Sequence, residues 1–374
     1  MLKYINGEPS ATNHYKNLYW EGYFTQEISW VIDKIQTNDI GSIRGQYSFL
    51  YVDKTVTPGV SYNLGYPLYT NGIDYSNDPL DLNAKINIDK LKDLVSCIAD
   101  NFTVPFDPAY YNCFDNCSMI QTTEILKLET QTLEKLKEDF LRTVEINTRN
   151  KSIAIMFGDG WESYALYNAC KILGRDVTLV NIKSRTPTRV QSLAKFVLLD
   201  TVTKDIHDLS FHNTRNFSIK HRYMTGTPLD FDVILKGNDA EIFQGSSDLW
   251  NSGYKNVKSI ITTCTTRNSI LELNTNNTWI DPFTNLDYTA SVLSGDTQLK
   301  NRSLQKELCT DHSIVISDDA KISTIFPNIV EKVFLQNIKY LQDLGLSNSI
   351  IKSLSRAEFG FWAQTFAKIL NRYV

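Results

Sequence analysis

The sequence of 374 residues lacks the features that mark several specialised classes of protein. Its six cysteines are scattered, which excludes a small domain held together by disulfides. Cys113 and Cys117 are the one close pair, and no second pair at ligand spacing accompanies them, so we predict no metal site there. No apolar run approaches the roughly 20 residues of a membrane span, and residues 1–7 lack the apolar core of a signal peptide. We therefore expect a cytoplasmic protein with reduced cysteines.

An excess of positive charge is also missing. The chain carries 38 lysines and arginines against 42 aspartates and glutamates, which gives a formal net charge of −4. No basic surface that would bind nucleic acid or an acidic membrane is therefore expected. The hydrophobic content of 42% is enough for a sizeable core, and the length favours two domains.

Residues 153–163 are the most informative stretch of the chain. Ile153 to Phe157 form an apolar run with the length of a buried strand, and glycines at positions 158 and 160 end it. A helical pattern of apolar residues follows from Ser163 to Leu173. A strand that turns through glycines into a helix leaves backbone N–H groups pointing at one place, with the positive end of the helix dipole behind them. Such a turn binds anions, usually phosphate, but it is not a Walker loop because no Gly-Lys-Ser/Thr follows.

The patterns around this stretch predict strands that alternate with helices. An amphipathic helix is expected over residues 133–144, before the strand, and a second apolar strand over 177–182, after the helix. This spacing favours a strand–helix–strand unit with parallel strands, and residues 231–235 read as a further core strand. Residues 1–80 read as short strands with one helix, and helical patterns recur from about residue 325.

Three segments carry a resemblance to a known family. Residues 43–53 and 63–69 contain Ile-Arg-Gly-Gln-Tyr-Ser-Phe-Leu-Tyr-Val-Asp and Asn-Leu-Gly-Tyr-Pro-Leu-Tyr. Residues 158–163 read Gly-Asp-Gly-Trp-Glu-Ser, and residues 232–245 read Asp-Val-Ile-Leu-Lys-Gly-Asn-Asp-Ala-Glu-Ile-Phe-Gln-Gly. In this order they resemble the asparagine synthetase family: its N-terminal amidotransferase domain, its Ser-Gly-Gly-x-Asp-Ser pyrophosphate loop and its Gly-x-Gly-x-Asp-Glu-Leu-Phe-Gly-Gly-Tyr segment. The resemblance ends near residue 250.

The resemblance implies an α/β fold with a doubly wound parallel sheet of the adenine nucleotide α-hydrolase type. A small β-rich, truncated amidotransferase-like domain would occupy residues 1–85, a connector rich in Pro, Asn and Asp residues 86–124, and a synthetase-like domain with a helical C-terminal region residues 125–374. The family's glutaminase needs a cysteine at the start of the chain, whereas Leu2 stands here. We therefore predict no hydrolysis of glutamine.

The resemblance also implies a reaction. With Mg²⁺ and ATP the family adenylates a carboxylate, releases pyrophosphate and passes the acyl group to an amine, so the expected partners are a small-molecule or peptide carboxylate and ammonia or an amine. A second copy of the chain, in a homodimer, is a further candidate partner. The family's roles would fall on two sets of residues. Those expected to bind the nucleotide are Gly158, Asp159, Gly160, Trp161, Glu162, Ser163 and Gly237, with Glu162 and Asp159 on magnesium. Those expected to face the reacting centre are Glu241 and Asp239.

Two departures from the family's loop leave two hypotheses open. Gly158 replaces a serine, which removes a hydrogen bond to phosphate worth about 1–3 kcal/mol. Asp159 replaces a glycine, and its charge about 4 Å from a phosphate would cost roughly 4 kcal/mol at an effective dielectric near 20 unless a magnesium ion lay between them. Asp159 is therefore either a new metal ligand or a mark of lost activity. The alternative to a ligase is a degenerate member of the family that binds a nucleotide or a partner and catalyses nothing.

Other charged residues carry two interpretations each. Ala240 falls on the family's acidic position, so either Glu241 or, with a shifted register, Asp239 supplies the carboxylate, and both fit equally well as helix N-terminal acids. Lys183, Arg185 and Lys236 follow predicted strands and are either phosphate ligands or solvated loop charges. The family also uses a C-terminal lysine on phosphate, for which the candidates are Lys300, Lys306 and Lys321.

Overall fold

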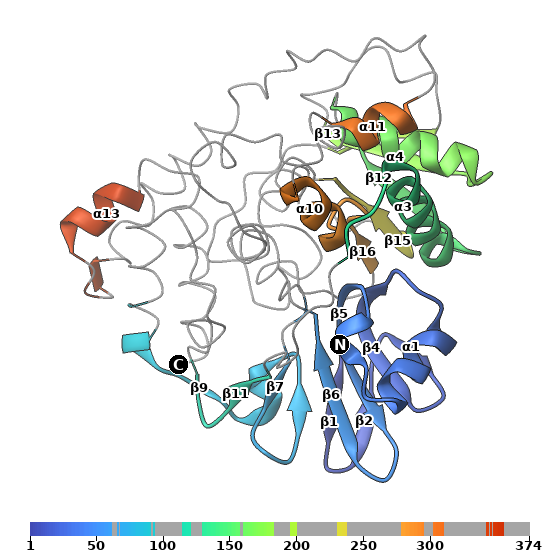
Figure 1. Ribbon diagram of the computed structural model, residues 1–374. Helices are drawn as coiled ribbons and strands as arrows, with labels where there is room; N and C mark the ends of the chain where they lie inside the picture. The colour runs from blue at the N-terminus through green and yellow to red at the C-terminus, as the bar shows by residue number, and fades with distance from the viewer. Residues whose placement is uncertain are drawn as a thin grey trace.

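A computed structural model of the protein gives a mixed α/β architecture (Figure 1). It describes residues 1–61, 66, 68–90, 93, 114–120, 129–157, 160–182, 195–199, 230–237, 278–294, 302–309, 342–343, 345 and 347–354. Within these residues an N-terminal unit of antiparallel sheets precedes a parallel sheet with helices beside it. None of the described helices combines the length and the apolarity that crossing a bilayer requires.

The N-terminal unit contains two larger antiparallel sheets and a two-stranded one. The first larger sheet has the order β11-β7-β8-β1-β2, built from β1 (Lys3–Ile5), β2 (Glu8–Ser10), β7 (Tyr69–Thr70), β8 (Tyr75–Ser76) and β11 (Ser118–Met119). The second has the order β3-β4-β5-β6, built from β3 (Asn13–Tyr15), β4 (Leu18–Phe24), β5 (Gly45–Val52) and β6 (Val56–Val60). Helix α1 (Ile28–Gln36) and the 3-10 turns η1 (Ile40–Ser42) and η2 (Pro79–Leu82) complete the unit, together with the pair β9 (Lys85–Ile86) and β10 (Phe114–Asp115).

The alternation of apolar residues along β5 explains why this unit has three layers. Tyr47 and Phe49 point to one side and pack with Val31 and Ile35 of α1. Leu50, on the other side, packs with residues of the first sheet such as Leu2 and Leu68. Both faces of the second sheet are therefore buried, one under a helix and one under a sheet.

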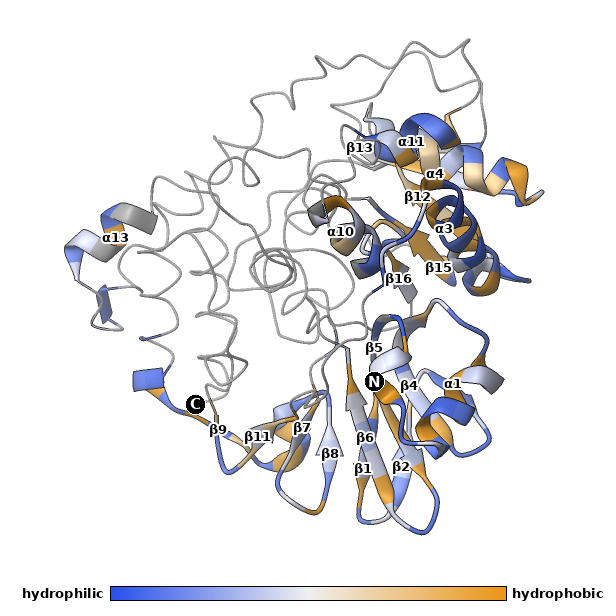
Figure 2. Cartoon of the chain, in the orientation of Figure 1, coloured by the Kyte–Doolittle hydropathy of each residue, from blue (hydrophilic) through white to orange (hydrophobic). Residues whose placement is uncertain are grey.

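Among the described residues, the parallel sheet has five strands in the order β14-β13-β12-β15-β16, and all four pairings are parallel. Its strands are β12 (Ile153–Met156), β13 (Thr178–Ile182), β14 (Lys195–Leu199), β15 (Val233–Leu235) and β16 (Thr278–Ile280). From β12 the chain advances to β13 and β14 on one side, and then returns to add β15 and β16 on the other. Residues of β15 are coloured as apolar throughout in Figure 2, as expected of a strand that is buried on both faces.

Two helices cover one face of this sheet. Apolar side chains of α3 (Leu133–Thr148) and α4 (Trp161–Ile172) form one core with Ile153, Ile155 and Leu235. Helix α11 (Ser303–Leu308) lies against α4, and its Leu304 and Leu308 belong to the same core. Alternate residues of the strands, including Ala154 and Ile234, pack with Trp279 on the opposite face. Two further helices, α10 (Leu286–Leu293) and α13 (Asn348–Leu354), complete the described elements.

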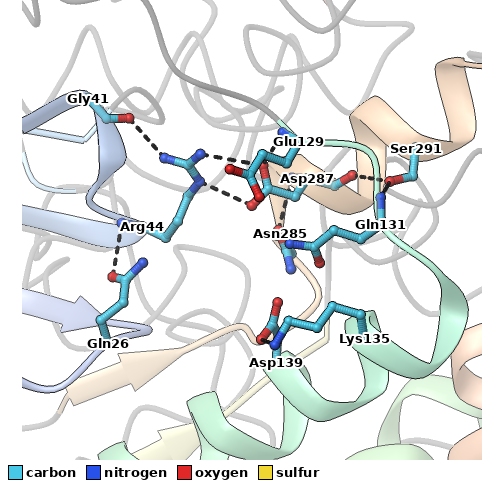
Figure 3. Close-up of polar contacts among 10 residues, drawn as sticks. All are labelled: Gln26, Gly41, Arg44, Glu129, Gln131, Lys135, Asp139, Asn285, Asp287 and Ser291. Atoms are coloured by element: carbon cyan, nitrogen blue, oxygen red, sulfur yellow. Dashed lines mark hydrogen bonds and ion pairs between the residues drawn. The ribbon is translucent and has the colours of Figure 1, made fainter.

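A buried ion pair joins the N-terminal unit to the parallel-sheet unit (Figure 3). Arg44 Nε and Nη2 donate to the two carboxylate oxygens of Asp287, on α10, over 3.2 and 3.4 Å, and Arg44 Nη1 donates to Gly41 O. The Glu129 N–H also donates to Asp287 Oδ1, so one carboxylate ties together three segments that are distant in sequence. Ser291, one turn later, accepts from the Gln131 N–H over 2.7 Å.

The strands and helices predicted around residues 133–182 and the parallel pairing are confirmed, and so is β15 within the predicted strand 231–235. Of residues 86–124, predicted to be a connector, the structure describes residues 86–90, 93 and 114–120. There β10 pairs with β9, and β11 pairs with β7 of the N-terminal unit. Strands of two residues are too short to show alternation, although Phe114 and Met119 are buried in them. The helical patterns predicted over 330–341 and 359–370 lie outside the described residues.

Candidate functional site

The candidate site lies at the carboxyl edge of the parallel sheet, between β12 and β15. The order of strands reverses at this pair, since β13 and β14 lie to one side and β15 and β16 to the other. At such a point the connections leave in opposite directions and open a crevice, which is where ligands bind in open α/β sheets. Residues 157–163 follow β12 and residues 236–237 follow β15, so two of the segments that carry the family resemblance end at the same edge.

Helix α4 begins at this edge without a side-chain cap. Gly160 is the residue before the first helical turn, and its backbone is extended, with φ −87° and ψ 157°. Its carbonyl accepts from the Ser163 N–H over 3.1 Å, so the helix starts where the glycine pattern predicts. Because Gly160 has no side chain, nothing of its own covers the positive end of the helix.

The carboxylate of Glu162 covers that end instead. A Cβ atom on Gly160 would lie 2.7 Å from Glu162 Oε2, which places the carboxylate directly over the start of α4. Arg302 Nε lies 3.8 Å from Glu162 Oε1, and the glutamate side chain is only 16% exposed. An acidic side chain is favourable at this place because it faces the positive end of the dipole. The predicted metal ligand is therefore in the first turn, held between the helix and an arginine.

Gly237 brings the second segment against Glu162. A Cβ atom on Gly237 would lie 2.7 Å from Glu162 Cβ, closer than real Cβ contacts come, and 3.0 Å from Phe283 Cε2, which is tighter than most of them. Only a glycine allows the end of β15 to approach the first turn of α4 this closely. Gly237, predicted to bind the nucleotide, therefore lies directly against the first turn of α4.

Cations from two elements border the same edge. Lys236 precedes Gly237 and is only 3% exposed, so the interpretation of Lys236 as a solvated loop charge is wrong. Its Nζ lies 5.9 Å from the centre of the Trp279 ring, at the range of a cation–π contact. On α11, Lys306 Nζ lies 6.0 Å from the centre of the Trp161 ring. Burial of Lys236 follows from its place after the strand, because it continues the alternation of Ile234 toward Trp279, on the face of the sheet opposite α3 and α4.

Cys309 and Asn168 lie behind Glu162. Burial raises the pKa of the Cys309 thiol to about 11; a hydrogen bond with the Asn168 side chain opposes this shift and the charge of Glu162 adds to it. The thiol is therefore protonated at neutral pH and is no nucleophile. Ser163, whose hydroxyl the resemblance assigns to phosphate, is buried in the first turn of α4.

Several predicted residues lie outside the part that the structure describes: Gly158, Asp159, Asp239, Glu241, Lys183, Arg185, Lys300 and Lys321. The structure brings together Gly160, Trp161, Glu162 and Gly237. It also adds Arg302 and Phe283, which sequence reasoning missed. No motif marks either residue, since both lie beyond residue 250 and reach the site through the packing of α11 and of the turn after β16.

Of the two predicted magnesium ligands, Glu162 and Asp159, the structure describes Glu162. Among the residues that the structure describes, no three His, Cys, Asp or Glu side chains gather in one place, so no metal cage made of protein alone occurs there. Mg²⁺ is usually bound by one or two carboxylates together with phosphate and water, and Glu162 supplies one such carboxylate beside the glycine turn.

Comparison with models of protein families and with curated protein sequences finds no match for this chain. Any assignment of function therefore depends on the site's geometry and on the motifs that it joins.

Proposed function

We propose that the protein is an ATP-dependent, AMP-forming ligase of the asparagine synthetase kind, with a doubly wound sheet like that of the adenine nucleotide α-hydrolases. It would adenylate a carboxylate and transfer the acyl group to ammonia or an amine without a glutaminase of its own. The observation that carries the proposal is the contact of Gly237 with Glu162 at the reversal of strand order. The segments 158–163 and 232–245 each resemble the family in sequence. Parts of both also lie together in space, at an edge of the sheet suited to a nucleotide.

The charges at this edge fit the demands of the reaction. Attack of an acceptor carboxylate on the α-phosphorus breaks the bond to pyrophosphate, on which negative charge then develops. The start of α4 at Gly160 and the guanidinium of Arg302 would hold that charge. Glu162 would hold Mg²⁺, which supplies Lewis-acid stabilisation of the phosphates. The amine then attacks the acyl carbon, and AMP leaves with the bonding pair.

The geometry suggests that the Glu162 carboxylate changes its ionic partner when a nucleotide binds. In the structure the glutamate carboxylate lies beside Gly160 and faces Arg302. A pyrophosphate group at the same place would repel this carboxylate unless a divalent cation lay between them. We therefore expect Glu162 to turn from Arg302 toward the cation, which leaves the guanidinium for the phosphate oxygens.

The test is the release of pyrophosphate with Mg²⁺ and ATP across a panel of nucleoside, peptide and amino-acid carboxylates, each with a panel of amines. Glu162→Gln keeps the shape but removes the charge, and it should lower turnover at least about 100-fold. Glu145→Gln, on the exposed face of α3, is the matched control and should leave turnover unchanged. Full turnover in Glu162→Gln would reject the assignment of this residue.

A second candidate is a protein that binds a nucleotide or a partner and catalyses nothing. One observation favours it: the ion pair of Glu162 with Arg302 already neutralises part of the place where phosphate would lie. Calorimetric titration with Mg-ATP separates the two proposals. Tight binding without turnover on any acceptor would support the second candidate, and turnover on any acceptor would exclude it.

A further inference from the structure

We propose that Tyr23 of the N-terminal unit is a positioning residue for the Glu162 site, which it reaches through the turn after β16. This proposal rests on the proposed function for its consequence on nucleotide binding. Its structural part, that a hydroxyl in the N-terminal unit sets the position of the first turn of α4, can be tested without any ligand.

The side chain of Tyr23 leaves its own sheet and enters the core of the parallel-sheet unit. It is 2% exposed and belongs to the cluster that also contains Phe140, Phe283 and Ile155. Its hydroxyl donates to the backbone carbonyl of Asp281 over 2.8 Å and lies 3.1 Å from Thr284 Oγ1. The N-terminal unit therefore makes a directed contact with the other unit, in addition to the Arg44–Asp287 ion pair.

A second residue of the same sheet reaches the same turn. Gln46 on β5 is the cross-strand partner of Tyr23 on β4, and its Nε2 donates to Thr284 Oγ1 over 2.9 Å. Gly45, next to Gln46, has φ +136°, and a Cβ atom there would lie 2.2 Å from the Tyr23 carbonyl oxygen. The close approach of the two strands, which requires glycine at this position, sets Tyr23 and Gln46 side by side toward the turn.

The turn at residues 281–284, which Tyr23 and Gln46 contact, is held by several hydrogen bonds. The carbonyl oxygen of Asp281 accepts from the Thr284 N–H over 3.1 Å, from Thr284 Oγ1 over 2.8 Å and from the Tyr23 hydroxyl. The Asp281 side chain accepts from the Phe283 N–H over 3.2 Å. Asp281 follows the last residue of β16, so this network fixes the direction in which Phe283 leaves the sheet.

Phe283 transmits the position of the turn to the site. Its ring lies 4.8 Å from that of Phe140, centre to centre, and its Cε2 would be 3.0 Å from a Cβ atom on Gly237. Gly237 in turn has no free space toward Glu162 Cβ. Tyr23, the turn, Phe283, Gly237 and Glu162 thus form a continuous series of contacts, and packed interiors of this kind pass on displacements because they compress little.

The series of contacts gives the N-terminal unit a structural role at the site, because this unit holds the turn that borders the candidate phosphate site. Removal of the Tyr23 hydroxyl should loosen the turn and with it Phe283, while the aromatic ring still fills the core. We expect Tyr23→Phe to weaken the binding of Mg-ATP roughly 2- to 10-fold, with kcat for bound substrate much less affected.

The first measurement follows the environment of Trp161 by ¹⁹F NMR without any ligand. Tryptophans are replaced by 5-fluorotryptophan, the ¹⁹F resonance of Trp161 is assigned with Trp161→Phe, and the resonance is compared in wild type, Tyr23→Phe and Tyr51→Phe. Tyr51 is the matched control, because its hydroxyl accepts from Gln36 Nε2 within the N-terminal unit and faces α1 rather than the site. We expect the Trp161 resonance to move or broaden in Tyr23→Phe and to stay in place in Tyr51→Phe.

Two outcomes overturn the proposal: an unchanged Trp161 resonance in Tyr23→Phe, or equal changes in both tyrosine variants. Titration of the same samples with Mg-ATP then tests the consequence. If wild type binds no nucleotide, the proposed function fails while the ligand-free spectra still decide the role of Tyr23. If wild type binds and Tyr23→Phe binds equally well despite a moved resonance, the structural link stands and its effect on affinity is rejected.

Discussion

Gly237 and Glu162, which are distant in sequence, meet with no space between them: a Cβ atom on Gly237 would lie 2.7 Å from Glu162 Cβ. The contact joins the end of β15 to the first turn of α4. It sets how far apart the two segments lie, and hence the shape of the crevice at the reversal of strand order. Glycine at position 237 therefore affects both the stability of the protein and the shape of the crevice in which a ligand would bind.

Gly237→Ala should destabilise the protein by about 1–3 kcal/mol, because either the strand end or the helix must shift to admit the methyl group. Urea unfolding measures this loss. Gly160→Ala is the comparison, since its new Cβ would meet only the flexible end of Glu162 at 2.7 Å, so a swing of the carboxylate removes the clash and the cost stays below about 1 kcal/mol. Equal costs for the two substitutions would contradict the close approach at Gly237.

The part of the fold that the sequence predicts is the part with long, regular patterns. Strand β12 and helix α4, with Gly160 just before the helix, appear where expected, because strand and helix periods are visible over that length. Strands β9 to β11 were not predicted, since two residues contain no period and their pairing depends on partners far away in sequence.

The same reasoning applies to the candidate site. Gly160, Glu162 and Gly237 belong to motifs, so their types and spacing identified them before the structure did. Arg302 could not be found in this way. It has a left-handed backbone, with φ 62°, just before α11, and it meets Glu162 only because α11 packs on α4. Lys236 is likewise buried because of the face of the sheet on which it lies. The sequence shows only that a lysine follows a strand, and not which face it occupies.

The ion pair between Arg44 and Asp287 should contribute strongly to stability. The two side chains are 14% and 9% exposed, and Arg44→Leu would leave a buried carboxylate with fewer donors. We expect a loss of roughly 3 kcal/mol in the free energy of unfolding. Arg149→Leu is the control: that arginine is 52% exposed, pairs with Glu27 and Glu145 over 3.8 and 3.6 Å, and should cost less than about 1 kcal/mol. A similar small cost for Arg44→Leu would show that the pair does not hold the two units together.

Asp232 should make stability depend on acid pH. Its carboxylate accepts from the Ser152 N–H and from Ser152 Oγ, both over 2.8 Å, where β12 and β15 begin. The bond from the Ser152 backbone, followed by that from its hydroxyl, holds the pKa of Asp232 below the ordinary 3.8. A pKa that is lower in the folded state adds stability above the unfolded value, and this stability is lost as the pH falls through the folded value.

Asp232→Asn should therefore be less stable than wild type at pH 7, by about 1 kcal/mol or less because the carboxylate is exposed, and the difference should shrink below about pH 4. Thermal unfolding across this range measures the difference. Ser152→Ala removes one of the donors and should reduce the same pH dependence. A difference of constant size from pH 7 to pH 3 would contradict the assigned hydrogen bonds.

Alkylation of cysteines can report on the charge of Glu162. Burial raises the pKa of Cys170 to about 12 and that of Cys309 to about 11, so both thiols should resist iodoacetamide at pH 8 in the folded protein and react readily once it is unfolded. The charge of Glu162 contributes to the raised pKa of Cys309, whereas Arg175 is the charged residue that acts on Cys170. Glu162→Gln should therefore speed the modification of Cys309 at high pH and leave that of Cys170 unchanged, as measured by mass spectrometry of the two cysteine-containing peptides. Equal acceleration at both cysteines would show that the substitution opens the α4–α11 contact rather than removing a nearby charge.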